Sequence, residues 1–144
     1  MKDEFIPYEI ALALKELGFN ENCLGCYSEL NELIIRIPDY RSFKIVSRFN
    51  IITKFNTYDN KTISAPLYQQ AFRWFRENYN LNGLVNHYSN VKLWGYSVHN
   101  LEWSGKELVE YSRKEDRSIK YDTYEKAELE CLKKLIEIVK NDKK

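Results

Sequence analysis

Two cysteines three positions apart are the residues whose possible chemistry is easiest to name. The segment CLGC places Cys23 and Cys26 at the C-x-x-C spacing, at which two thiolates can share a tetrahedral zinc ion or form a redox-active disulfide. A structural zinc ion needs four ligands, and the other candidates, Cys131, His87 and His99, show no second ligand spacing. We therefore expect no metal and no cofactor, and Cys23 and Cys26 remain weak metal candidates.

Positive charge gathers in residues 36–54. This segment has a single acid, Asp39, and contains the candidate binding residues Arg36, Arg41, Lys44 and Arg48, together with Lys54, Tyr40, Phe43 and Phe49. Cations for phosphates and aromatic rings for bases are what single-stranded nucleic-acid binding requires. We prefer a second interpretation, in which strands place these charges in water and these rings in the core.

The segment SAPLYQQAFRWFREN, Ser64 to Asn78, predicts an amphipathic helix. One side of its helical wheel carries Tyr68, Ala71, Phe72, Phe75 and Tyr79, with Trp74 at the edge, and the other carries Gln69, Gln70, Arg73, Arg76 and Glu77. Burial at ~1.5–3 kcal/mol for each ring explains this pattern by folding alone. Gln69, Arg73 and Arg76 are still candidate binding residues, because their side chains can hydrogen-bond bases and phosphates.

Two histidines lie on the arms of a predicted hairpin, LVNHY and KLWGYSVHN, which is joined through Ser89 and Asn90. His87 and His99 can face each other across such a hairpin. We find no serine, cysteine or acid at a motif spacing from them, so we predict solvent-facing histidines and no catalytic constellation.

The remaining segments predict the elements around these candidates. We expect a helix from Pro7 to Gly18, a loop from Asn20 to Asn31, strands within residues 32–55 and 107–121, and a final helix that begins with a capping box of Asp122 and Glu125. On that helix Glu130 and Lys134 are spaced for an ion pair. The order helix, strands, helix, strands, helix predicts an α+β fold, an antiparallel β-sheet with three α-helices packed mainly on one face.

Length and composition limit the class of protein. The 144 residues suit a single domain, 1–144, and the hydrophobic fraction of 44% argues against disorder. The net charge of +1 gives no overall attraction to DNA or to an anionic membrane. The acidic start MKDEF and the short apolar runs predict no signal peptide and no membrane segment, and the odd number of cysteines fits a cytoplasmic protein.

Three segments carry a family resemblance: IPYEIALALKELGFNE, SAPLYQQAFRWFREN and TYEKAELECLKKLIEIVK. Together they resemble a group of small proteins encoded by phages, prophages and other mobile elements of gut anaerobes, a group with no established activity. Where this chain has CLGCY, the group usually has a single cysteine, so Cys26 departs from its pattern. The resemblance implies a mobile-element accessory protein. Such proteins commonly bind another macromolecule.

We therefore expect a non-enzymatic binding module whose partner is another protein. The alternative is a nucleic-acid-binding protein that uses the basic and aromatic segment 36–54. The sequence indicates no oligomeric state.

Overall fold

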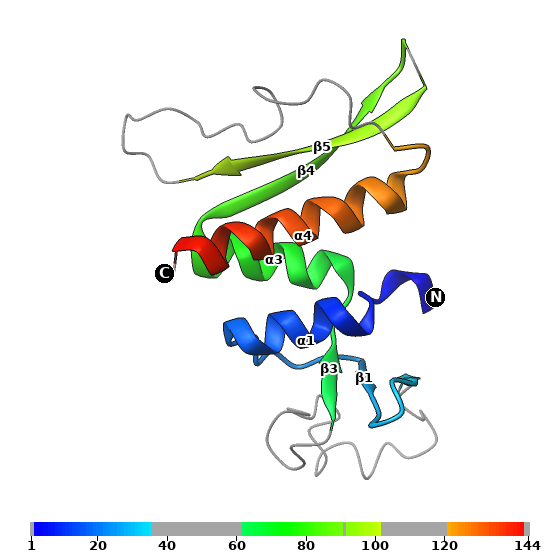
Figure 1. Cartoon of the computed structure of the whole chain (residues 1–144), viewed down its shortest axis with the longest axis vertical. Helices are drawn as coiled ribbons and strands as arrows, with labels where there is room; N and C mark the ends of the chain where they lie inside the picture. Colours follow the sequence, from blue (N-terminus) through cyan, green and yellow to red (C-terminus); the bar gives the residue numbers. More distant parts are fainter. Residues whose placement is uncertain (1, 36–61, 91, 102–120, 143–144) are drawn as a thin grey trace, which may run out of the picture. The chain divides into compact units, whose positions relative to one another are not determined.

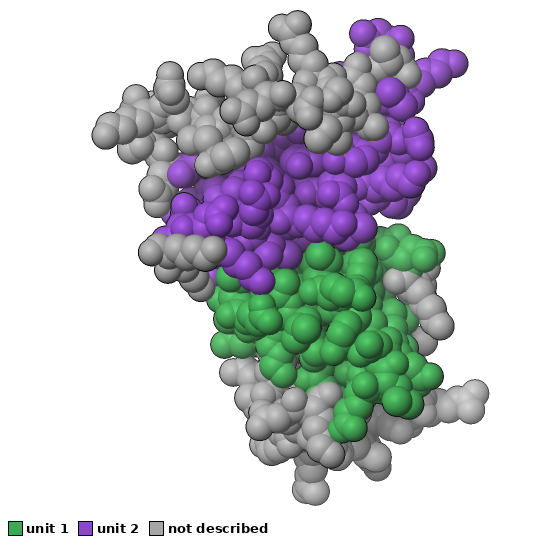
Figure 2. All heavy atoms as spheres, in the orientation of Figure 1, with its two compact units in different colours: residues 1–68 green, residues 69–144 purple. Residues whose placement is uncertain are grey.

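The computed structural model describes residues 2–35, 62–90, 92–101 and 121–142. The elements in chain order are η1 (Lys2–Glu4), α1 (Tyr8–Leu17), β1 (Gly25–Tyr27), β2 (Leu33–Ile35), β3 (Ile63–Ala65), α3 (Tyr68–Tyr79), β4 (Leu81–Tyr88), β5 (Leu93–Asn100) and α4 (Tyr124–Asp142) (Figure 1). Helices and antiparallel strands together confirm the predicted α+β fold. The described strands form two sheets, of order β2-β1-β3 and β4-β5, where we expected one. The chain divides into two compact units, residues 1–68 and 69–144 (Figure 2).

The first helix of unit 1 begins and ends as predicted. Pro7 precedes α1 in an extended conformation, and Gly18 ends it in the left-handed region with φ of 102°. The Gly18 amide donates to the Lys15 carbonyl over 3.0 Å and the Phe19 amide donates to the Leu14 carbonyl over 2.9 Å, which satisfies two groups that the helix end leaves open. Ile10, Ala11, Leu14 and Leu17 are buried on one side of the helix.

The three-stranded sheet corrects the predicted loop from Asn20 to Asn31. Gly25, Cys26 and Tyr27 form β1, the central strand, which pairs antiparallel with both β2 and β3. All three residues are buried, so the strand lacks the alternation of apolar and polar residues that identifies a half-buried strand. In addition, β3 includes Ser64 and Ala65, so the helix expected from Ser64 begins only at Tyr68.

The residues that precede α1 pair with the end of unit 1. Phe5 forms an isolated antiparallel bridge with Leu67, and the Ile6 amide donates to the Pro66 carbonyl over 3.1 Å. From β1, the Tyr27 hydroxyl donates to the Ile6 carbonyl over 2.6 Å. The residues that precede α1 are therefore hydrogen-bonded both to β1 and to the segment that follows β3.

Unit 2 packs helix α4 against the β4-β5 hairpin, as Figure 1 shows. The buried residues of α4 are Ala127, Cys131, Leu132, Leu135, Ile136, Ile138 and Val139. In α3 the buried residues are Ala71, Phe72, Trp74 and Phe75, whereas Tyr68 and Tyr79 are half-buried. The apolar side of α3 was therefore predicted largely correctly.

The hairpin is longer than predicted. Its turn at Ser89 and Asn90 is confirmed, but β4 begins at Leu81, before the predicted arm LVNHY, and so contains Asn82 and Gly83 as well. The break between α3 and β4 lies at Asn80, whose φ is 54°. Asparagine tolerates this left-handed conformation better than most residues, so a single residue is enough to turn the chain.

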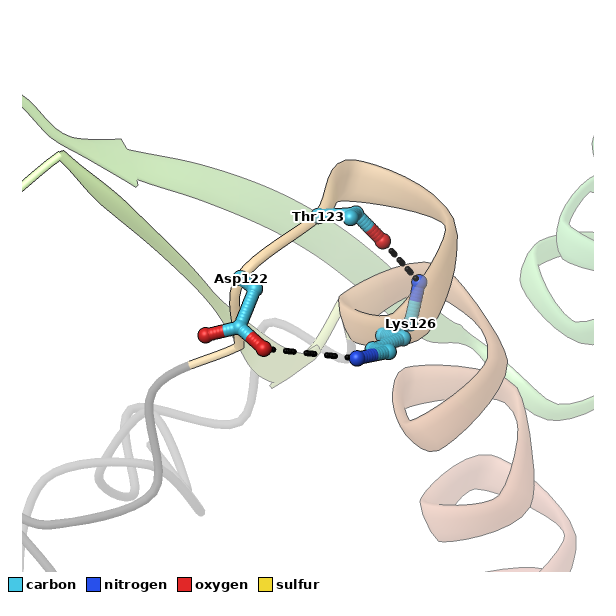
Figure 3. Close-up of polar contacts among 3 residues, drawn as sticks. All are labelled: Asp122, Thr123 and Lys126. Carbon is cyan, nitrogen blue, oxygen red and sulfur yellow. Dashed lines mark hydrogen bonds and ion pairs between the residues drawn. The ribbon is translucent and has the colours of Figure 1, made fainter.

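The start of α4 corrects the predicted capping box (Figure 3). The Thr123 hydroxyl, and not Asp122, accepts a hydrogen bond from the backbone amide of Lys126, at 3.3 Å. Asp122 instead pairs with the Lys126 ammonium group, also at 3.3 Å. Threonine and aspartate are both good N-caps, and two adjacent candidates cannot be separated by their types alone.

The predicted ion pair between Glu130 and Lys134 is also replaced. Glu130 pairs with Lys133 at 2.6 Å, and Lys134 pairs with Glu137 at 3.0 Å. Both pairs have the i,i+3 spacing, which is equally available on a helix surface.

Candidate functional site

The two faces of the β4-β5 hairpin have different neighbours. Trp94 lies opposite His87 in the register, and its ring centroid is 5.3 Å from that of Tyr124 in α4. Gly83 lies opposite Val98 on the same face, where the side chains of α4 are close to its backbone. This inner face is therefore the one that packs against α4.

The outer face of the hairpin combines exposed apolar side chains with a polar cluster. Leu84 lies opposite Ser97 and is 45% exposed, and Tyr88 is 38% exposed. The Asn86 amide Nδ2 donates to Ser97 Oγ over 3.1 Å, and His99 Nε2 lies 3.0 Å from the same oxygen. We define the outer face by these five residues.

Little in the sequence indicates the outer face. Leu84 and Tyr88 looked like ordinary strand residues, and Asn86 and Ser97 belong to no recognisable motif. The signal that was available is the spacing of Ser97 and His99, because residues two apart on a strand share a face. Only the register shows that Asn86 lies across from Gly95, diagonal to Ser97.

The two histidines do not face each other, which corrects one prediction. His87 lies opposite Trp94 and its ring centroid is 4.6 Å from the indole. His99 lies opposite Asn82, on the other face of the hairpin. His87 is at an odd position of β4, whereas Asn82 is at an even one, and alternate strand residues point to opposite faces.

Of the predicted binding residues, those on α3 can be placed. Gln69 and Arg73 are exposed and Arg76 is half-buried. Arg73 pairs with Glu77 at 3.9 Å, an i,i+4 ion pair on the exposed side of α3. The other four candidates, Arg36, Arg41, Lys44 and Arg48, lie outside the described residues.

The cysteines of the C-x-x-C segment are buried in unit 1. Cys23 is 3% exposed and Cys26 is 2% exposed, and neither forms a disulfide. Within the described ranges of the chain, no group of three or more His, Cys, Asp or Glu side chains is placed to hold a metal ion. Cys26 lies in the central strand β1, so it serves the packing of the sheet.

The third cysteine lies under the hairpin. Cys131 is fully buried in α4, and its thiol lies 4.0 Å from the Ser97 carbonyl oxygen. Burial, together with the nearby Glu128 carboxylate, raises the pKa of this thiol from 9.0 to about 12. Burial also raises the pKa of the neighbouring Tyr96 hydroxyl to about 12, with a smaller contribution from Tyr121.

The raised pKa of Cys131 predicts a loss of stability at alkaline pH. The thiol ionises near its ordinary pKa of 9.0 in the unfolded chain and near 12 in the folded one, so the unfolded state holds fewer protons between these values. The free energy of unfolding should therefore fall as the pH rises through this window, by ~1 kcal/mol for each pH unit. Denaturant titrations of the wild type and Cys131→Ala at a series of pH values measure this fall in the free energy of unfolding.

The difference in unfolding free energy between the wild type and Cys131→Ala reports on the thiol, because tyrosines such as Tyr96 titrate in both proteins. The stability difference should be constant below about pH 8, where the thiol is protonated in both states, and should shrink above it. If this difference in unfolding free energy stays constant up to pH 11, about two units above the ordinary pKa of a thiol, the pKa of Cys131 is not raised by burial.

Comparison with protein-family models, with curated proteins and with solved structures finds no match to this chain. No described helix has the length and apolar character that crossing a membrane requires.

Proposed function

We propose that this protein is a non-enzymatic accessory protein of a phage or other mobile element and acts by binding another protein. The observation that carries the proposal is the outer face, where Leu84 and Tyr88 are exposed beside Asn86 and His99. Exposed apolar and aromatic side chains among neutral polar groups are typical of protein-binding surfaces. The resemblance to mobile-element proteins supports the biological setting.

A protein partner is favoured over a nucleic acid by the charges of the described candidates. The five side chains of the outer face include no lysine or arginine, and nucleic-acid binding depends on such cations. On α3, the charge of Arg73 is offset by Glu77 at 3.9 Å. Nucleic-acid binding through segment 36–54 stays a prediction, and it requires an affinity that falls steeply with salt.

The outer face can be tested with a charge substitution and a matched control. Leu84→Asp should abolish capture of the partner, because it puts a carboxylate where the partner buries an apolar surface. Leu30→Asp is the control, because Leu30 is an even more exposed leucine, at 80%, in unit 1. The measurement is affinity purification from the native host, with proteins quantified for the wild type and both variants.

We expect one protein that is retained by the wild type and by Leu30→Asp and is lost with Leu84→Asp. Equal recovery with all three chains would show that the outer face does not bind the partner. Enrichment of nucleic acid that is lost in high salt would favour the alternative function.

A further inference from the structure

Ser97 is held between two nitrogen atoms on the outer face. Asn86 Nδ2 lies 3.1 Å from Ser97 Oγ, and His99 Nε2 lies 3.0 Å from it. These two groups are its hydrogen-bond partners within the described part of the chain. Because Ser97 is only 6% exposed, water has little access to complete the hydrogen bonds of the hydroxyl.

The number of protons in this cluster limits which of its hydrogen bonds can form together, and the direction of the Ser97–His99 bond depends on the tautomer of His99. The Asn86 amide nitrogen can only donate, so Ser97 Oγ accepts from it. The single hydroxyl proton of Ser97 then has one acceptor in reach, the lone pair of His99 Nε2. If Nε2 carried a proton instead, the hydroxyl would accept twice and leave its own proton unpaired, which is costly in a buried site. In the tautomer that carries its proton on Nδ1, His99 Nε2 accepts the Ser97 proton and the hydrogen bonds of the cluster are complete.

This arrangement is the one in which a histidine activates a serine. A neutral imidazole whose Nε2 accepts from a serine hydroxyl can remove that proton as the oxygen attacks a carbonyl carbon. From these contacts we propose that Ser97 is a nucleophile, that His99 is its general base, and that Ser97 takes up an acyl group from an activated ester. This single, stoichiometric acylation needs no catalytic turnover, so it is compatible with a non-enzymatic protein, and it goes beyond the proposed binding function without depending on it.

The reaction forms one bond and breaks another. Ser97 Oγ bonds to the carbonyl carbon of the ester while the bond from that carbon to the leaving oxygen breaks. The hydroxyl proton passes to His99 Nε2 and then to the leaving group or to water. The products are an acylated Ser97 and a free alcohol or phenol, and no oxidant or reductant is needed.

The surroundings of Ser97 indicate the class of acyl group. Leu84 lies directly opposite Ser97 on the same face and is 45% exposed, so it offers an apolar contact beside the hydroxyl. The low exposure of Ser97 admits a small group more easily than a bulky one. A short, uncharged acyl group such as acetyl fits both observations.

The test uses the full chain and p-nitrophenyl acetate. Mass spectrometry should find one acetyl group on Ser97 of the wild type and none at this position in Ser97→Ala. His99→Gln should slow acetylation of Ser97 on the order of a hundredfold, the usual contribution of a general base. His87→Gln is the matched control, because His87 lies on the inner face, and it should react like the wild type.

Circular dichroism and thermal unfolding identify any variant that fails to fold. If Ser97→Ala does not fold, mapping the acetyl group on the wild type still shows whether Ser97 is the residue that is acetylated. Acetyl groups confined to lysines, or a Ser97 rate that His99→Gln leaves unchanged, would overturn the proposal. Both outcomes are independent of partner capture by Leu84, so the acylation of Ser97 and the binding of a protein partner can each be refuted without the other.

Discussion

Gly83→Ala should destabilise unit 2 by about 2–3 kcal/mol, because the added methyl group has no free space. A Cβ atom at this position would lie 2.7 Å from Cys131 Sγ, 2.7 Å from Phe72 Cε1 and 3.1 Å from Leu135 Cδ1. All three neighbours are buried, and interiors at normal packing density leave them little room to move. Equilibrium unfolding in urea measures the loss.

Gly95→Ala is the matched control on the partner strand. Its Cβ atom would also meet a neighbour at 2.7 Å, but that neighbour is the ring of Tyr88, which is 38% exposed. The ring can turn toward solvent, and alanine is favoured over glycine in a strand by roughly 0.5–1 kcal/mol. We expect Gly95→Ala to stay within about 1 kcal/mol of the wild type. If Gly83→Ala and Gly95→Ala lost the same free energy of unfolding, the close packing around Gly83 would be contradicted.

Phe75→Ala should cost about 3–5 kcal/mol, the usual loss when a buried phenylalanine is truncated. Phe75 is fully buried in α3, and its ring centroid is 5.1 Å from that of Trp74 and 6.0 Å from that of Tyr79. A loss of this size is comparable with the whole stability of many small proteins. Urea unfolding followed by circular dichroism should show a much lower midpoint, or an unfolded chain.

Two further substitutions on α3 serve as controls for Phe75→Ala. Phe75→Leu keeps most of the apolar volume and should cost clearly less than Phe75→Ala. Glu77→Ala removes an exposed partner of Arg73 and should change stability by less than about 0.5 kcal/mol. A Phe75→Ala protein as stable as Glu77→Ala would mean that the apolar side of α3 is not in the core.

The sequence predicts the helices of this protein better than its strands. The limits of α1 follow from Pro7 and Gly18, whose backbone preferences act within a single turn. The apolar sides of α3 and α4 follow from the 3.6-residue period, which needs no knowledge of the rest of the chain. By contrast, β1 is a strand only because β2 and β3 pair with both of its edges.

The outer face could not be predicted for a related reason. The contact between Ser97 and His99 follows from local alternation, but the contact with Asn86 depends on the register of two strands. A shift of one residue would place Asn86 on the opposite face. Similarly, Asp122 and Thr123 are both suitable caps, and the choice between them depends on where the chain enters α4.

The pairing of Phe5 and Ile6 with Leu67 and Pro66 has a consequence for biosynthesis. A ribosome makes the first residues long before their partners, so this bridge cannot form until residue 67 has left the exit tunnel. Helix α1 depends on local hydrogen bonds and can form earlier. During translation, Phe5 and Ile6 can therefore form these backbone contacts only after the end of unit 1 has been synthesised.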